Sequence, residues 1–173
     1  MDPIQAKLKE ARVARLATVD AEGRPHVVPV CFAYDGEVFY TAVDHKPKQV
    51  APEKLARVKN IQRSPHVALL IDHYDEDWSK LWYVLVRGKA KLVQASNLEH
   101  AKAFRALRAK YPQYAAGMLV QDAPIIRINV EHICGQGAIL TSRKPSDMGH
   151  PATLKYAHFE SLHSCFCWNV SPV

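Results

Sequence analysis

Residues 25–43 read PHVVPVCFAYDGEVFYTAV, two segments rich in β-branched and aromatic residues on either side of an Asp-Gly pair. Asp35-Gly36 in this setting is a strong signal for a two-residue hairpin turn, because glycine readily adopts the positive φ that such turns require. The pattern predicts one strand over residues 25–34 and an antiparallel strand over 37–43.

Four further segments have the same character. The turn residues AEGR at 21–24 join a strand over 14–20 to the strand over 25–34, which makes a hairpin. The remaining strands are predicted at 66–72, 81–93 and 123–133. Gly88 interrupts the long strand over 81–93 and is expected to mark a β-bulge.

Three helices are expected around these strands. The first begins near Asp2 and Pro3 and buries Ile4, Leu8 and Ala11. The second runs from Pro52 to about Gln62, with Leu55, Val58 and Ile61 on its inner face and basic residues on its outer face. The third follows a capping box at Ser96 to Glu99 and ends near Lys110, with Leu98, Ala101, Phe104 and Leu107 facing inward.

Six strands joined mostly by hairpins, with helices at the periphery, predict an antiparallel barrel of the α+β class. The chain has no GxGxxG or GxxxxGK[ST] motif, so a parallel dinucleotide-binding sheet and a P-loop are disfavoured. Periodicity ends near Ser142. We therefore predict one domain over residues 1–141 and an irregular tail over 142–173, whose CxC lacks the CxxC pairs of zinc modules, and we assign no metal site.

Composition limits the cellular setting. The chain has 173 residues, and its longest apolar segments fall short of the roughly 20 residues that a membrane helix requires. The N-terminus lacks the apolar core of a signal peptide, and the four cysteines show no disulfide spacing. These features favour a cytoplasmic protein without a membrane span.

Positive charge gathers after the strand over 37–43. The net charge is +6, and residues 46–63 hold six basic side chains against one acid. Lys46 and Lys48 flank Pro47, and side chains two apart on an extended backbone point the same way, so both can converge on one anion. Without a nucleic-acid motif, the residues leave two interpretations open, a site for a phosphorylated small molecule or solvated surface charge.

The residues ARLATVDAEGRPHVVPVCFAYDGEVFYTAVDHKPK and HVALLIDHYDEDWSKLWYVLVRGKAKL resemble the split β-barrel flavin and deazaflavin proteins of the pyridoxamine 5′-phosphate oxidase-like class. The resemblance covers residues 10 to about 133. Within this class, residues 72–78 and Trp82 look most like the actinobacterial branch of coenzyme F420-dependent enzymes.

The resemblance implies a homodimer of split barrels with the cofactor in a groove at the subunit interface. It places Val28, Pro29 and Val30 beside the ring, Thr41, Ala42, Val43 and Asp44 along the groove, and Lys46 and Lys48 on the phosphate. Trp78 and Trp82 would approach from the other subunit, although both could equally be core or interface aromatics.

The implied activity is hydride transfer between coenzyme F420 and a small organic substrate that remains unknown. No catalytic side chain is assigned, and the candidates for a proton donor are His45, His73, Tyr74 and Tyr83.

Two alternatives stay open: an FMN-dependent oxidase or reductase on the same fold, and a carrier that binds F420 or flavin without turnover. The acids at 72–77 are interpreted as a solvated turn and Cys31 as a buried apolar residue.

Overall fold

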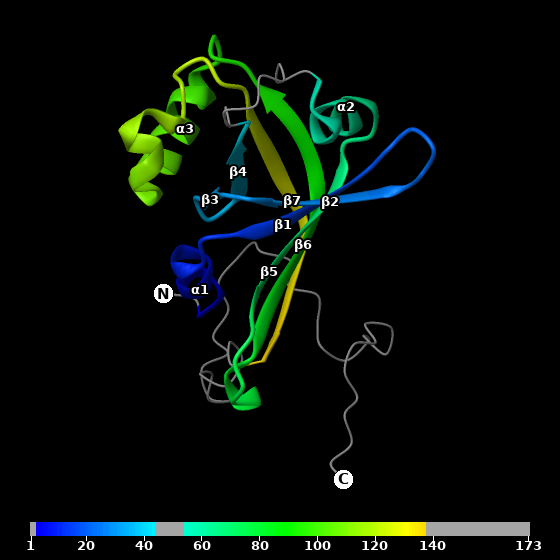
Figure 1. The fold of residues 1–173 in the computed structure, drawn as a ribbon, viewed down its shortest axis with the longest axis vertical. Coiled ribbons are helices and arrows are strands. Elements are labelled where there is room, and N and C mark those ends of the chain that lie inside the picture. Colours follow the sequence, from blue (N-terminus) through cyan, green and yellow to red (C-terminus); the bar gives the residue numbers. More distant parts are fainter. Residues whose placement is uncertain (1–2, 44–53, 138–173) are drawn as a thin grey trace, which may run out of the picture.

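The computed structural model describes residues 3–43 and 54–137, and its body is one antiparallel sheet of seven strands. The strands are β1 (Ala14–Val19), β2 (Pro25–Val30), β3 (Ala33–Tyr34), β4 (Val38–Ala42), β5 (His66–His73), β6 (Trp82–Val93) and β7 (Ile125–Gly137). Their order in the sheet is β2-β1-β5-β6-β7-β4-β3. Figure 1 shows the sheet strongly curled, with its longest strands side by side.

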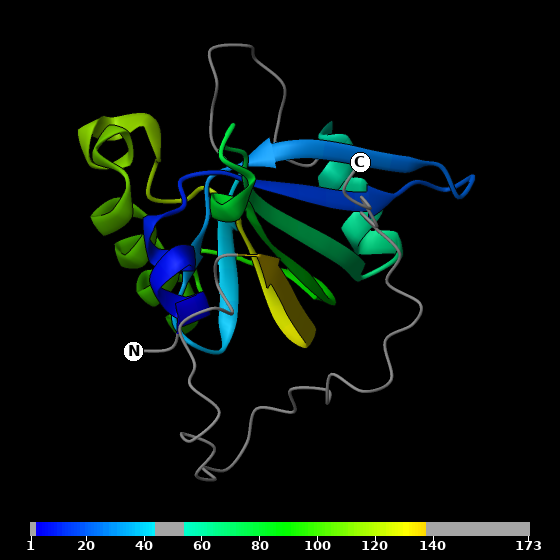
Figure 2. The ribbon, with the colours of Figure 1, turned by 90° about the horizontal axis from the view of Figure 1, so that it is seen from below.

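The sheet curls because β2 and β3 are neighbours in the chain but lie at opposite ends of the strand order. Only Cys31 and Phe32 separate them, so the Cα atoms of Val30 and Ala33 are at most about 11 Å apart. The two ends of the sheet must therefore approach each other. Figure 2 shows the resulting arrangement of strands around a common interior.

This connection corrects one prediction. The single strand expected over residues 25–34 is two strands, β2 paired with β1 and β3 paired with β4, so the sheet has seven strands where six were predicted. The apolar pattern continues through Cys31 and Phe32, and local sequence does not reveal that the chain changes partner there. The predicted class is confirmed: the fold is an antiparallel α+β split barrel.

The predicted turns and bulge are confirmed. The tight turn predicted at Asp35-Gly36 is present but lies one residue later: the Asp35 N–H donates to the Val38 carbonyl at 3.3 Å, so Gly36 and Glu37 are the two turn residues, with Gly36 at φ 107°. The register of β6 against β7 shifts between Arg87 and Gly88, and a Cβ on Gly88 would lie 2.0 Å from the carbonyl oxygen of Asn129. Only glycine allows the two backbones to approach so closely.

Helices cover the barrel at three places (Figure 1). In α1 (Pro3–Glu10), Ile4 and Leu8 enter the barrel core, as predicted. In α2 (Ala56–Arg63), Val58 and Ile61 enter the same core, and buried Asn60 donates to Thr18 Oγ1 at 3.0 Å. The helix α2 begins later than predicted, and residues 52–53 of that prediction lie outside the described ranges.

The helix α3 (Leu98–Lys110) packs on the outer side of β3 and β4, and its inward face was predicted only in part: Leu107 is buried and Phe104 packs against the same cluster, but Leu98 and Ala101 do not. Asn97, and not Ser96, caps it by accepting from the N–H of Glu99. The buried side chains are His100, Ala103 and Leu107, whereas Leu98 is 94% exposed and Ala101 is exposed too. The alanines at 101, 103, 106 and 109 lie on several sides of the helix, so the sequence does not show which side faces the sheet. The buried contact of His100 Nε2 with the Ala123 carbonyl at 2.9 Å determines that side.

Tyr111, just after α3, closes the gap where β2 passes to β3. Its hydroxyl accepts from the N–H of Phe32 at 2.9 Å and lies within hydrogen-bond distance of the carbonyl oxygens of Phe32 and Arg12. At the crossing, Phe32 has no strand partner for these groups, and buried backbone groups require one. Burial raises the pKa of Tyr111 to about 12, which keeps the hydroxyl proton available.

We expect Tyr111→Phe to destabilise the protein by about 1–3 kcal/mol, because it leaves the buried Phe32 N–H without its acceptor. The free energy of unfolding is measured by urea denaturation. Tyr74→Phe, which removes the hydroxyl of an exposed tyrosine, is the matched control and should change stability by less than about 0.5 kcal/mol. Equal effects of the two substitutions would contradict this role of Tyr111.

Candidate functional site

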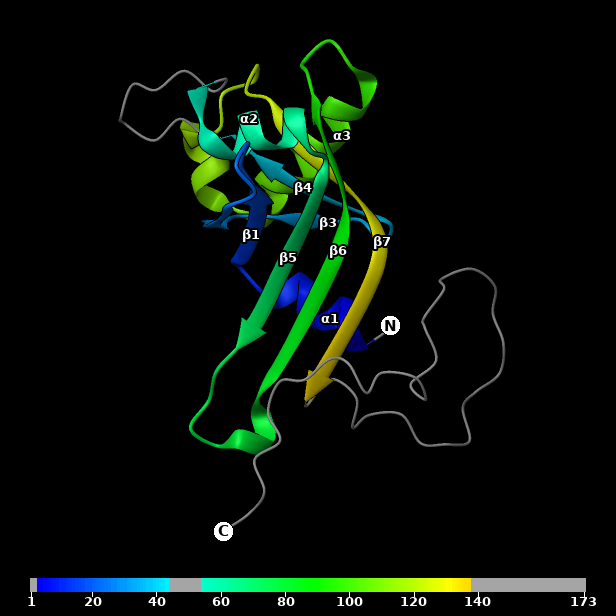
Figure 3. The ribbon, with the colours of Figure 1, turned by 90° about the vertical axis from the view of Figure 1, so that its right-hand side faces the viewer.

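The outer surface of β2, β1, β5 and β6 has no described helix in front of it, and Figure 3 shows the β5 and β6 part of this surface. The side chains that point outward there form what we call the open face. They are Pro25, Val27 and Pro29 of β2, Arg15, Ala17 and Val19 of β1, Ala68 and Leu70 of β5, and Leu85 of β6.

The centre of the open face is mostly apolar, with one cation, Arg15, which lies between Pro29 and Leu70 and pairs with Asp72. Ala17 lies directly opposite Val27 on one side and Ala68 on the other, and Leu70 lies opposite Leu85. Val27 is 59% exposed, and Val19 and Leu70 are exposed as well. Contiguous exposed apolar surface is a common feature of protein interaction sites. The homodimer expected from the sequence stays a prediction, and the open face is an exposed surface on which it can be tested.

The three residues predicted beside the ring have different environments. Val30 is buried in the barrel core and Val28 packs against that core, whereas Pro29 points outward on the open face. This difference follows from the alternation of side chains along a strand. Of the three, only Pro29 offers its side chain to a molecule outside the barrel.

The predicted groove residues Thr41, Ala42 and Val43 are all buried. Ala42 lies in the cluster beneath α3, and Val43 lies in the barrel core, where its N–H donates to the Pro124 carbonyl at 3.0 Å. Asp44, His45, Lys46 and Lys48 lie outside the described residues. The assignment of phosphate to the two lysines thus stays a prediction.

The two tryptophans differ in exposure. Trp82 is buried in its own barrel core, stacked on His73 at 6.2 Å, with Lys7 Nζ 5.6 Å from its ring centre. Trp78 is 55% exposed in the short helix η2 (Trp78–Lys80) at the far end of the β5–β6 hairpin. Trp78 can therefore reach a partner molecule, whereas Trp82 serves its own core.

The described candidates for a proton donor lie near this hairpin end. His73 Nε2 is 3.8 Å from Asp75 Oδ2, and the exposed Tyr74 donates weakly to Glu76 at 3.5 Å. The Tyr83 hydroxyl donates to Gln136 Oε1 at 3.2 Å. These contacts leave the choice of proton donor open.

Lys110 was not singled out from the sequence. Its Nζ donates to the Leu8 carbonyl at 2.9 Å and lies 3.8 Å from the centre of the Phe32 ring. Burial, with a smaller contribution from the charge of Arg12, lowers the pKa of Lys110 to about 8. Lys110 thus ties α1 to α3 at the strand crossing, a contact between distant residues that no local pattern signals.

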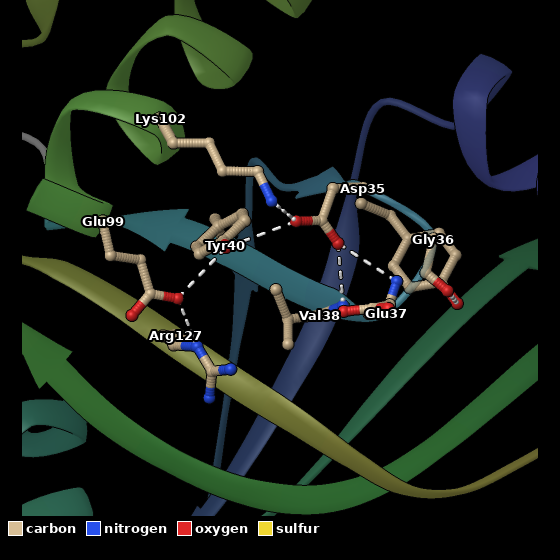
Figure 4. Close-up of polar contacts among 9 residues, drawn as sticks. Asp35, Gly36, Glu37, Val38, Tyr40, Glu99, Lys102 and Arg127 are labelled. Carbon is tan, nitrogen blue, oxygen red and sulfur yellow. Dashed lines mark hydrogen bonds and ion pairs between the residues drawn. The ribbon is translucent and has the colours of Figure 1, made fainter.

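A polar network under α3 was also missed (Figure 4). The Tyr40 hydroxyl lies 3.3 Å from Asp35 Oδ2 and 3.2 Å from Glu99 Oε1, Lys102 donates to Asp35 at 2.6 Å, and Arg127 donates to Glu99. Burial, reinforced by the two carboxylates, raises the pKa of Tyr40. The network fastens the β3–β4 turn to α3 and β7.

Within the described residues, no group of three or more His, Cys, Asp or Glu side chains could hold a metal ion. The acids at 72–77 instead contact neighbouring protein groups: Asp72 pairs with Arg15, and Asp77 caps η2 and pairs with Lys80 at 3.2 Å. Each helix among these residues is too short or too polar to span a bilayer.

Residues 1–136 match the family model of pyridoxamine 5′-phosphate oxidase. The chain belongs to this family. Membership of this family accounts for the split barrel. The matched range includes the strands that form the open face. Among curated proteins, none matches this chain.

Solved structures with the same fold differ in the cofactor that their names state. An F420 reductase is 25% identical, with 75% of this chain and 94% of that chain covered and a TM-score of 0.54. A FAD-binding protein from Mesorhizobium loti is 21% identical over 76% and 88% of the two chains, with a TM-score of 0.55. HutZ, the heme storage protein from Vibrio cholerae, is 18% identical over 76% and 90%, with a TM-score of 0.62.

We expect Asp35→Asn to weaken the acid dependence of stability. Burial raises the pKa of Asp35, but hydrogen bonds from Lys102 and from the N–H groups of Val38 and Glu37 outweigh it and hold the pKa below 3.8. The ionised form therefore stabilises the fold above about pH 4, and this contribution is lost as the pH falls through the folded-state pKa.

The test compares urea midpoints of wild type and Asp35→Asn at pH 6 and pH 3. Asparagine can still accept from the turn N–H groups, so the variant should lose less stability on acidification than wild type. Because Lys102 is exposed, the difference should stay within about 1 kcal/mol. Parallel losses in both proteins would contradict this assignment.

Proposed function

We propose that this protein is a homodimeric oxidoreductase that binds coenzyme F420 at the subunit interface and transfers a hydride between the deazaflavin and a small organic substrate. The observation that carries the proposal is the open face, an exposed apolar surface on the barrel of a pyridoxamine 5′-phosphate oxidase family member. The likeness to an F420 reductase supports the choice of cofactor.

The described residues fit a planar ring at the edge of this face. Pro29 and Val27 present exposed apolar surface on β2, and Trp78 is an exposed aromatic that a second protomer can supply. The side chains of Val28, Val30, Thr41, Ala42 and Val43 pack inside their own barrel, so their contribution to a groove would come from the backbone. Backbone groups and flat apolar side chains suit a ring with polar edges.

The phosphate end of the cofactor would be held by Lys46 and Lys48. In the sequence, both lysines lie within five residues after Val43, just beyond the end of β4. They precede the basic helix α2, which carries exposed Lys59 and Arg63. Lysine binds phosphate as a mobile point charge, and two lysines in one connection can bind a single phosphodiester.

When bound, the deazaflavin supplies the hydride chemistry itself. The chain's residues bind the ring, orient it and exclude water through the apolar surface of Pro29 and Val27 and through the partner's Trp78. If the substrate needs a proton, the described candidates near the hairpin end that also bears Trp78 are His73, Tyr74 and Tyr83.

A second candidate function is storage or transport of a cofactor without turnover. The likeness to HutZ, a heme storage protein, favours it, as does the absence of an assigned catalytic side chain. An FMN-dependent oxidase or reductase is the corresponding alternative among enzymes, because lysines bind the phosphate of either cofactor. A direct comparison of cofactors separates these functions.

We expect the purified protein to bind F420 more tightly than FMN, FAD or heme in parallel fluorescence and absorbance titrations. Lys46→Ala/Lys48→Ala should weaken F420 binding at least tenfold, since two charge-assisted contacts are lost. Lys9→Ala/Arg105→Ala, which removes two exposed charges on α1 and α3, is the matched control and should leave affinity unchanged.

The outcomes separate the alternatives. Preferential binding of heme or FMN would reject F420 as the cofactor. F420 affinity that the Lys46→Ala/Lys48→Ala variant retains would reject the phosphate assignment. Tight F420 binding without reduction of any member of a substrate panel by the reduced cofactor would favour the carrier.

We further expect Leu70→Asp to convert a dimer into a monomer in analytical ultracentrifugation. Leu70 is exposed at the centre of the open face, so a carboxylate there is tolerated by the monomer, whereas in the dimer it would lose its water beside Arg15, which already pairs with Asp72. Leu98→Asp on α3 is the control, because Leu98 is exposed away from this face. A monomeric wild-type protein would contradict the proposed assembly.

A further inference from the structure

Three cations follow one another along the outer side of β6. Arg87, Lys89 and Lys91 occupy alternate positions, all exposed, so their side chains leave the sheet on the same side as Leu85. We call these three residues the basic strip. Lys89 pairs with Glu131 at 3.0 Å, whereas Arg87 and Lys91 form no ion pair with any residue in the described ranges.

The other end of the same strand begins at an acidic connection. Residues 74–80, which we call the acidic loop, contain Asp75, Glu76 and Asp77 with Lys80 as the one basic side chain. Lys80 lies 3.2 Å from Asp77 and 4.0 Å from Asp75, whereas Glu76 has no cation within ion-pair distance among the described residues. The loop also exposes Tyr74 and Trp78.

The apolar centre of the open face lies between these two charged regions. The Leu70–Leu85 pair separates the acidic loop at one end of the β5–β6 hairpin from the basic strip toward the other end. Figure 3 shows the two strands and the connection between them. Lys91 is about 20 Å from Leu85 along the strand, and Trp82 is about 10 Å from it in the opposite direction, with the loop beyond.

Consider two protomers whose open faces pack against each other about a two-fold axis that runs across the strands at Leu70–Leu85. The strands of the two protomers are then antiparallel. A residue at a given distance from Leu85 on one protomer faces the residue at the same distance in the opposite direction along the strand on its partner. Asp72 and Tyr83 then face Arg87, and the acidic loop faces Lys89 and Lys91. An axis parallel to the strands would instead set basic strip against basic strip.

We propose that the acidic loop of each protomer docks on the basic strip of its partner, and that this pairing selects the antiparallel arrangement of the two open faces. The inference rests on the proposed dimer and names the residues that determine its orientation. Charge complementarity contributes mainly to the choice of arrangement, while burial of the apolar centre supplies much of the affinity. The docked loop carries Trp78 onto the partner's open face.

The test exchanges the two charges. Glu76→Lys and, separately, Arg87→Glu/Lys91→Glu should each weaken dimerisation at least tenfold in sedimentation equilibrium at low salt. The variant with all three substitutions, or an equimolar mixture of the two variants, should dimerise at least threefold more tightly than either variant alone, since the reversed charge at position 76 again faces charges of opposite sign at positions 87 and 91.

The controls make the result specific. Glu10→Lys reverses an exposed acid on α1 and should leave dimerisation unchanged. Raising the salt concentration to 1 M should reduce the defects of both variants, because the opposed charges are screened. Circular dichroism confirms that each variant folds, which is expected since all substituted side chains are exposed.

The outcomes distinguish this inference from the proposed function. A dimer that neither charge reversal weakens, or that the combined substitutions do not restore, overturns the docking of loop on strip and leaves the F420 titration unaffected. Recovery in the combined variant supports the docking whichever cofactor binds. A monomeric wild-type protein overturns the docking together with the proposed dimer.

Discussion

The passage of the chain from β2 to β3 through Cys31 and Phe32 is the constraint on which the rest of the structure depends. These two residues join strands at opposite ends of the sheet, and so they force the sheet to close on itself. The cost is a backbone segment without strand partners, which the Tyr111 hydroxyl offsets by bonding Phe32. Lys110 also joins α1 to this crossing, because its Nζ donates a hydrogen bond to the Leu8 carbonyl.

Closure of the sheet gives each strand an inner and an outer surface with different tasks. Inward side chains, such as Val30 and Trp82, form one packed core that α1 and α2 complete. The outer surface is divided: α3 covers the part over β3 and β4, and no helix of residues 3–43 or 54–137 covers the open face. A barrel of this size has its interior filled by its own side chains, so a large ligand has to bind outside it.

The same fold occurs in solved structures whose names state F420, FAD and heme. The strands of the barrel leave an outer surface, and the connections at its ends carry charged and aromatic residues in this chain. In this chain the two such connections are residues 44–53, with Lys46 and Lys48, and the acidic loop with Trp78. We therefore look for the residues that distinguish this chain's function in these connections, because a fold by itself does not determine function.

The amino-acid sequence by itself determined the hairpin turn at Asp35-Gly36, the bulge at Gly88, the segments that form strands and the inner faces of α1 and α2, because alternation and turn chemistry act locally. The exchange of partner at Cys31–Phe32, the inward face of α3 and the burial of Trp82 beside an exposed Trp78 were decided only by the tertiary structure. Each depends on contacts between residues far apart in the chain, such as Tyr111 with Phe32 and His100 with Ala123, and no local pattern encodes these contacts.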